Sequence, residues 1–154
     1  MPKEIERKFL VKDDSWRSPD PGKQYRQGYL STVKERTVRV RTAGEQGFIT
    51  VEGINTGATR SEYEYKIPLA DAEEMLDQLC ERPLIEKTRY RIPFADLVWE
   101  VDEFEGDNRG LITAEVELKD EKQAVSIPAW AGEEVTGDSR YINANLLARP
   151  FYKW

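Results

Sequence analysis

The chain contains no histidine and a single cysteine among its 154 residues. The lack of histidine excludes catalytic triads with an imidazole base and zinc sites built from histidine, so carboxylates remain as the candidate metal ligands. Carboxylate oxygens suit hard cations such as Mg²⁺ or Mn²⁺. Cys80 has no second cysteine for an internal disulfide, and its apolar helical surroundings favour a buried structural thiol over a nucleophile.

Long apolar runs are also missing. No segment approaches the roughly 20 apolar residues that span a bilayer, and residues 1–4 lack the apolar stretch of a signal peptide. We therefore expect a cytoplasmic protein with no membrane partner. The net charge of −6 argues against a sequence-blind nucleic-acid binder.

What the chain does contain is a repeated pattern of charges two residues apart. Because side chains alternate faces along a strand, each set lies on one face and the residues between take the other. A solvated face of an ordinary antiparallel sheet explains such alternation too. Segregation of the signs and the recurrence of long charged side chains favour the lining of a closed barrel. The sets are Glu4, Glu6, Lys8; Arg39, Arg41; Arg60, Glu62, Glu64, Lys66; Lys87, Arg89, Arg91; Glu100, Asp102; and Glu115, Glu117, Lys119.

Alternation and turn residues predict eight strands. These span about residues 3–11, 25–32, 36–43, 47–53, 60–67, 85–94, 97–105 and 111–119. A helix is predicted over 71–80, where Ala72, Met75, Leu76 and Leu79 recur at helical spacing and Asp71 supplies a cap. A helical turn at about 120–125 and a helix at about 141–147 complete the prediction.

The fold expected from these elements is mainly β (α+β). It is an eight-stranded antiparallel closed tunnel barrel with a charged interior and a few outer helices. No repeat or linker divides the chain, so residues 1–154 are expected to form a single domain.

A barrel that encloses so many charges has to be wide and wet, because unpaired charges are costly to bury. Basic side chains such as Arg39 and Lys87 suit phosphate oxygens. Acidic side chains such as Glu4 and Glu115 suit divalent cations that bridge those phosphates. The pattern therefore predicts a site for polyphosphate and metal.

The segment Glu4-Ile5-Glu6-Arg7-Lys8 resembles the ExExK opening of the CYTH domain, whose members are also called triphosphate tunnel metalloenzymes. The resemblance covers nearly the whole chain and implies an eight-stranded tunnel that acts on triphosphates with Mg²⁺ or Mn²⁺. The short chain favours hydrolysis of inorganic triphosphate to pyrophosphate and phosphate. The matching segments continue in order with Arg26 to Leu30, Arg39-Val40-Arg41, Arg60 to Glu64, Ile85 to Tyr90, Trp99 to Asp102, Ala114 to Glu117, and Glu134 to Tyr141.

The resemblance also implies roles for individual side chains. The expected metal ligands are Glu4, Glu6, Glu115, Glu117 and Asp102. The expected phosphate ligands are Lys8, Arg39, Arg41, Lys87 and Arg89, with Arg140 reaching over the tunnel mouth. Tyr29 and Lys87 form a candidate catalytic pair for proton transfer, and a core position is the alternative for Tyr29. Glu62 and Glu64 are expected to orient neighbouring bases through ion pairs.

One position departs from the family pattern. Glu52 stands where relatives usually carry a lysine, on the parity that faces the tunnel. This leaves open a weakened enzyme, an additional metal ligand or an introduced substitution. The alternatives to an inorganic triphosphatase are therefore a non-catalytic polyanion-binding module, a thiamine triphosphatase and a class IV adenylyl cyclase. The sequence shows neither a heptad seam nor a distinct apolar patch, so it predicts no oligomeric state.

Overall fold

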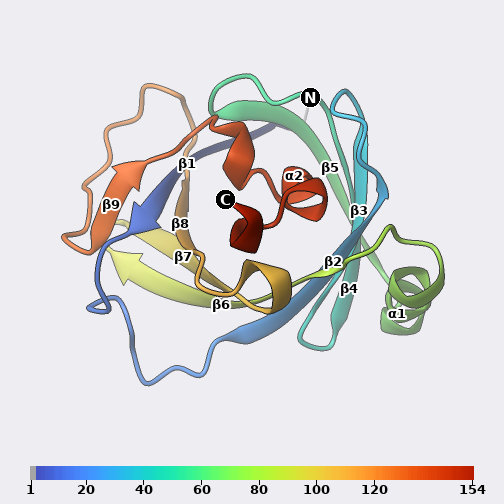
Figure 1. Ribbon diagram of the computed structural model, residues 1–154. Coiled ribbons are helices and arrows are strands. Elements are labelled where there is room, and N and C mark those ends of the chain that lie inside the picture. Colours follow the sequence, from blue (N-terminus) through green and yellow to red (C-terminus); the bar gives the residue numbers. More distant parts are fainter. Residues whose placement is uncertain (1–2) are drawn as a thin grey trace.

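The computed structural model of the chain describes residues 3–154. Its sheet is antiparallel in the order β5-β4-β3-β2-β6-β7-β8-β1, and an additional pairing of β1 with β5 closes it into a barrel (Figure 1). The predicted closed eight-stranded barrel is therefore confirmed. Its strands are β1 (Lys3–Val11), β2 (Lys23–Ser31), β3 (Thr37–Ala43), β4 (Gln46–Glu52), β5 (Thr59–Ile67), β6 (Ile85–Phe94), β7 (Leu97–Phe104) and β8 (Ile112–Glu117).

Strand β1 closes the barrel by changing partners along its length. Residues 3–5 pair with β5, and residues 6–10 pair with β8. A short ninth strand, β9 (Ala131–Glu134), pairs with β1 at Phe9 and Val11 and was not predicted. Four residues that include Gly132 and two glutamates show neither alternation nor β-branched enrichment, so β9 depends on its place beside β1.

Helix α1 (Leu69–Gln78) packs on the outside of β3 and β4. Ala72 and Leu76 are fully buried there against Val40. The predicted start of this helix was wrong: Pro68 occupies the N-cap, and Asp71 lies in the first turn without capping it. Pro68 has an extended ψ of 138°, so the helical backbone begins at the residue that follows it.

The C-terminal elements lie across one end of the barrel (Figure 1). They are η2 (Ser139–Tyr141), α2 (Asn143–Ala148) and η3 (Phe151–Lys153). Tyr141 and Leu146 form one buried cluster with Tyr29, Ile85 and Phe104 of the barrel strands. The expectation of a few outer helices is therefore correct for α1, whereas the C-terminal helices close an end of the tunnel.

Two connecting segments contain short turns, and one of them differs from the prediction. The segment expected to be helical at 120–125 contains only a turn at residues 121–122, because the Asp120 side chain accepts a hydrogen bond from the Lys122 backbone N–H at 2.7 Å. Such a local side-chain bond competes with helix formation. The β7–β8 connection contains a short 3₁₀ turn, η1 (Gly106–Asn108).

The apolar faces of the barrel strands turn outward, as predicted. Phe9, Trp99 and Trp130 pack together there, with the Trp99 ring 5.3 Å from that of Phe9 and 5.7 Å from that of Trp130. Cys80 is a buried free cysteine that belongs to the cluster under α1. Within residues 3–154, no helix has the length and apolar character needed to cross a membrane.

Candidate active site

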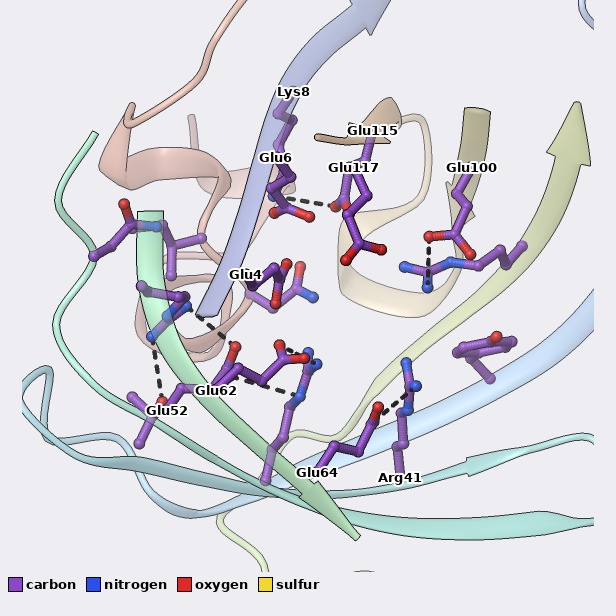
Figure 2. A pocket seen from close by; sticks show the side chains of 18 of the residues that line it. Glu4, Glu6, Lys8, Arg41, Glu52, Glu62, Glu64, Glu100, Glu115 and Glu117 are labelled. Carbon is purple, nitrogen blue, oxygen red and sulfur yellow. Dashed lines mark hydrogen bonds and ion pairs between the residues drawn. The ribbon is translucent and has the colours of Figure 1, made fainter. Parts of the chain in front are cut away.

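The inner face of the barrel encloses a cavity of about 310 Å³ lined mostly by charged side chains (Figure 2). Period-two spacing brings these side chains inward from seven strands. The cations that line it are Lys8, Arg39, Arg41, Arg60, Arg89 and Arg91, and the carboxylates are Glu4, Glu6, Glu52, Glu62, Glu64, Glu100, Glu115 and Glu117.

Three carboxylates from different strands meet on one wall. Oxygen atoms of Glu4, Glu52 and Glu62 lie within 4.8 Å of one another (Figure 2). Burial and a hydrogen bond with Glu62 raise the pKa of Glu4 to about 8. Such crowding of negative charge is relieved by a bound proton or a cation.

A second acidic group lies beside it. Glu6 pairs in register with Glu117, and Lys8 pairs with Glu115 across the same two strands. Burial and the nearby Glu115 hold the pKa of Glu6 well above its usual value. Burial raises the pKa of Glu115, but the combined attraction of Lys8, 3.4 Å away, Arg89 and Lys87 outweighs it and lowers the pKa to about 2.

These carboxylates fit a hard divalent cation. They offer oxygen donors from β1, β4, β5 and β8, and burial together with nearby carboxylates raises the pKa values of Glu4 and Glu6. Four of the predicted metal ligands, Glu4, Glu6, Glu115 and Glu117, line the cavity. The structure adds Glu52 and Glu62 to the acids that surround Glu4.

Arg39 is the most loosely held of the enclosed arginines. Its Nε lies 3.7 Å from Glu52 and its Nη2 lies 4.0 Å from Glu62, distances too long for strong hydrogen bonds. Arg60 is anchored more firmly, because it donates to the Gly53 carbonyl at 3.1 Å and faces Glu52 at 3.6 Å. Glu52 thus points into the tunnel, as predicted, and lies between two arginines.

Arg41 and Arg89 share one aromatic ring. Their guanidinium carbons lie 5.2 Å and 4.9 Å from the centroid of Tyr25. Arg41 also donates to Glu64 at 2.9 Å, which agrees with the predicted ion-pairing role of Glu64. The cation–π contacts hold both arginines at the cavity wall.

Lys87 and Asp102 lie behind the cavity wall. Both are 1% exposed, and Lys87 Nζ lies 2.9 Å from the Asp102 carboxylate, which also accepts two hydrogen bonds from Arg89 at 2.7 and 2.9 Å. Burial lowers the pKa of Lys87 to about 8. Asp102 therefore pairs with Lys87 and Arg89 and does not line the cavity with the other expected metal ligands.

The two members of the candidate proton-transfer pair face different neighbours. Tyr29 lines the cavity, and burial raises its pKa to about 12 against the opposing effect of Arg39. Lys87 is engaged with Asp102 and lies 5.4 Å from the Phe104 ring. Their proposed pairing therefore stays a prediction.

Arg140 lies near the tunnel end but is mostly exposed. It pairs with Asp138 at 2.9 Å, and its guanidinium carbon lies 5.3 Å from the Tyr141 ring and 5.5 Å from the Trp154 ring. It does not line the described cavity. A role at the mouth remains a prediction that requires its release from Asp138.

Sequence reasoning left several lining residues without a role. Arg60, Arg91 and Glu100 belong to the alternating sets, so strand parity alone could have placed them in the tunnel. Asn55, Ile142 and Asn143 come from connecting segments, where period-two reasoning does not apply.

A closed antiparallel barrel with basic and acidic side chains facing a shared cavity defines the class of charged β-tunnel proteins. The chain belongs to the CYTH domain family, because the CYTH domain model matches residues 2–151.

The relatives agree with this assignment. The chain is 51% identical to an inorganic triphosphatase of Acetivibrio thermocellus, with 98% of this chain and 97% of the relative covered. It is 41% identical to an inorganic triphosphatase of Nitrosomonas europaea over 93% of this chain and 95% of the relative.

Solved structures share the fold of this chain. A crystal structure of an inorganic triphosphatase aligns with a TM-score of 0.65 and 36% identity over 96% of this chain and 95% of its own. A putative adenylate cyclase from Bacillus halodurans, at 16% identity and a TM-score of 0.63, covers 79% of this chain and 84% of its own and shares the fold.

Proposed function

We propose that this protein hydrolyses inorganic triphosphate to pyrophosphate and phosphate with the help of a divalent cation. The observation that carries the proposal is the 51% identity, over nearly the full length of both chains, to a protein named as an inorganic triphosphatase. The protein is accordingly an inorganic triphosphatase, a phosphoanhydride hydrolase. The charged cavity supports this activity on physical grounds.

The charge of the tunnel supports a need for metal. Eight carboxylates and six cations line the cavity, so without bound cations or protons it is net negative. A triphosphate adds several more negative charges to the same enclosed space. Binding is then favourable only if cations enter with the substrate.

We propose Mg²⁺ or Mn²⁺ as that cation, held by Glu4, Glu6, Glu115 and Glu117, with Glu52 and Glu62 as neighbouring donors. Such an ion neutralises phosphate charge and acidifies a bound water when present. Carboxylate oxygens on facing walls fit this chemistry.

The cations of this chain would bind the substrate itself. We propose that Lys8, Arg39, Arg41 and Arg89 hold phosphate oxygens and stabilise the charge that develops on the leaving pyrophosphate. Arg39 is the best placed, because it is enclosed and only loosely paired. Asp102 would serve mainly to fix Lys87 and Arg89, and Lys87, with its lowered pKa, is poised to exchange a proton near neutral pH.

The same cavity favours a small inorganic substrate. Its volume of about 310 Å³ is at the lower end of the range of ligand pockets, about 300–1,000 Å³. The Tyr25 ring already makes cation–π contacts with two guanidinium groups, and a stacked base would compete with them. We therefore expect a nucleoside or thiamine group to add little to binding.

The test is a comparison of phosphate release from inorganic triphosphate, ATP, thiamine triphosphate and pyrophosphate, each at the same free Mg²⁺ or Mn²⁺. We expect the largest kcat/KM with inorganic triphosphate, with one phosphate and one pyrophosphate formed per substrate. A higher kcat/KM with ATP or thiamine triphosphate would assign a different substrate. Tight triphosphate binding without release would indicate a polyanion-binding module.

A further inference from the structure

One fully buried polar side chain of the tunnel wall has no hydrogen-bond partner among the described residues. Gln27 of β2 is 0% exposed, and neither its Oε1 nor its Nε2 is paired. A buried amide left unpaired costs free energy, so native proteins rarely retain one without a reason. Gln27 therefore requires an explanation that packing alone does not supply.

The direction of the Gln27 side chain follows from its neighbours. Tyr25 and Tyr29, two residues to either side, both line the cavity. Gly28 faces the outer side, where an added Cβ would lie 2.7 Å from atoms of Cys80 and Leu84. Gln27 is thus on the inner face, directly beneath the substrate cavity.

Arg41 lies directly opposite Gln27 in the β2–β3 pairing. Side chains at such positions are close enough to touch. The Nε of Arg41 is also buried and, within residues 3–154, without a hydrogen-bond partner. A donor that lacks an acceptor and an acceptor that lacks a donor therefore occupy facing positions.

The contacts of the Arg41 guanidinium explain why Arg41 Nε is not bonded to Gln27 Oε1. Its Nη2 donates to Glu64 at 2.9 Å, and its guanidinium lies 5.2 Å from the centroids of both Tyr25 and Phe48. In this arrangement the guanidinium is oriented toward Glu64. A phosphate in the cavity offers Arg41 a second, more highly charged partner.

We propose that Gln27 is a positioning residue for Arg41 in the substrate complex. In the substrate complex the guanidinium of Arg41 turns from Glu64 to the oxygens of a phosphate. Gln27 Oε1 then accepts a hydrogen bond from the Arg41 Nε–H and fixes the plane of the guanidinium. The unpaired amide of the free protein is then the cost of a contact that forms only with substrate bound. This inference rests on the proposed triphosphatase function.

The test uses Gln27→Met, which keeps the length of the side chain and removes its polar atoms. We expect KM for inorganic triphosphate to rise about tenfold with little change in kcat, as for the loss of one hydrogen bond to a charged group. The melting temperature should stay the same or rise, because an unpaired buried amide has been removed. Gln27→Leu provides a second apolar variant, and Gln24→Met on the outer face of the same strand is the matched control with unchanged KM.

A double-mutant cycle distinguishes positioning from simple packing. Lysine has no Nε–H of the guanidinium type, so Gln27→Met should have almost no further effect on KM in an Arg41→Lys background. An equal rise in KM in both backgrounds would overturn the inference, as would a lower melting temperature with unchanged KM. The wild-type protein in the same assay tests the function separately: if it releases no phosphate, the proposed activity fails, whereas failure of the cycle with an active wild type concerns Gln27 alone.

Discussion

Glu4 and Glu6 are enclosed carboxylates whose charged form is disfavoured mainly by burial. They lie two residues apart on the inner face of β1, and the pKa of each is raised by burial and by neighbouring acids. A divalent cation removes this repulsion, which is why the two residues are expected to contribute to metal affinity more than to folding.

We predict that Glu4→Gln or Glu6→Gln lowers metal-dependent turnover by about 100-fold or more, on the order seen for lost metal-site interactions. Because each change removes a repelled charge, the melting temperature should be unchanged or higher. Initial rates over a Mg²⁺ titration, with thermal unfolding in parallel, measure both effects. Glu86→Gln, at an outward-facing position of β6, is the control. Full activity of either variant at low Mg²⁺ would remove that residue from the ligand set.

Asp102 has the opposite character, because its charge is fully compensated. Burial raises its pKa, but the ion pairs with Arg89 and Lys87 outweigh this and hold the pKa well below the ordinary value. A depressed carboxyl pKa adds stability that is complete above the unfolded-state value near pH 4 and is lost as the pH falls below it.

We therefore predict that Asp102→Asn destabilises the protein by about 3–5 kcal/mol at neutral pH, since it leaves two buried cations without their partner. The difference from wild type should shrink toward about pH 3. Denaturant unfolding at several pH values measures this, with exposed Asp107→Asn as the control. A difference that is constant across this range would show that the pair does not supply the pH-dependent stability.

Glu52 affects both binding and stability. It lies 3.7 Å from Arg39 and 3.6 Å from Arg60, so it separates two like charges. We predict that Glu52→Lys lowers KM for triphosphate several-fold, because the cavity becomes less negative. It should also lower the melting temperature, because the new lysine would lie next to the cations of Arg39 and Arg60. Glu52→Gln should give intermediate values of both. A fall in kcat with unchanged KM would indicate that Glu52 is a metal ligand or a proton-transfer group.

The strands that form the tunnel could be predicted because their pattern is strict. Charges at every second position of β1, β3, β5 and β8 fix both the strand and the face that turns inward. The same parity predicts most of the charged lining. It could not reveal which charges pair, because Arg60 with Glu52 and Lys87 with Asp102 meet across strands whose register the sequence does not state.

The elements that were missed or misplaced depend on tertiary contacts. Strand β9 exists because β1 offers an unpaired edge at Phe9 and Val11. The proposed role of Gln27 could not be predicted from the sequence either. Nothing in the strand pattern indicates that this uncharged side chain is buried opposite Arg41. Neither feature follows from local propensity.

The C-terminal elements are predicted to be part of the site and not only a cover. Leu146 of α2 is 1% exposed and packs in the cluster that contains Tyr29, while Ile142 and Asn143 line the cavity. We predict that Leu146→Ala lowers the free energy of unfolding by about 2–5 kcal/mol and reduces kcat/KM. Leu79→Ala, at a position that is 67% exposed after α1, should change stability by less than about 0.5 kcal/mol. Normal kcat/KM in a clearly destabilised Leu146→Ala variant would show that the end of the tunnel does not shape the site.

The chain as a whole combines a net charge of −6 with a substrate that is itself strongly anionic. Long-range attraction of triphosphate by the whole molecule is therefore not expected, and binding depends on the local cations of the tunnel and on divalent ions. We propose that residues 1–154 act as one domain, because the tunnel uses side chains from β1 near the start of the chain to Asn143 near its end.

The decisive measurement of metal-dependent triphosphate hydrolysis is the initial rate of phosphate release from inorganic triphosphate as free Mg²⁺ is varied from full chelation to saturation. We expect no release in the chelated protein and a saturable rise as Mg²⁺ fills the acidic side of the tunnel. Release at an undiminished rate in the presence of chelator, or none at any Mg²⁺ or Mn²⁺ concentration by a folded protein, would contradict this expectation.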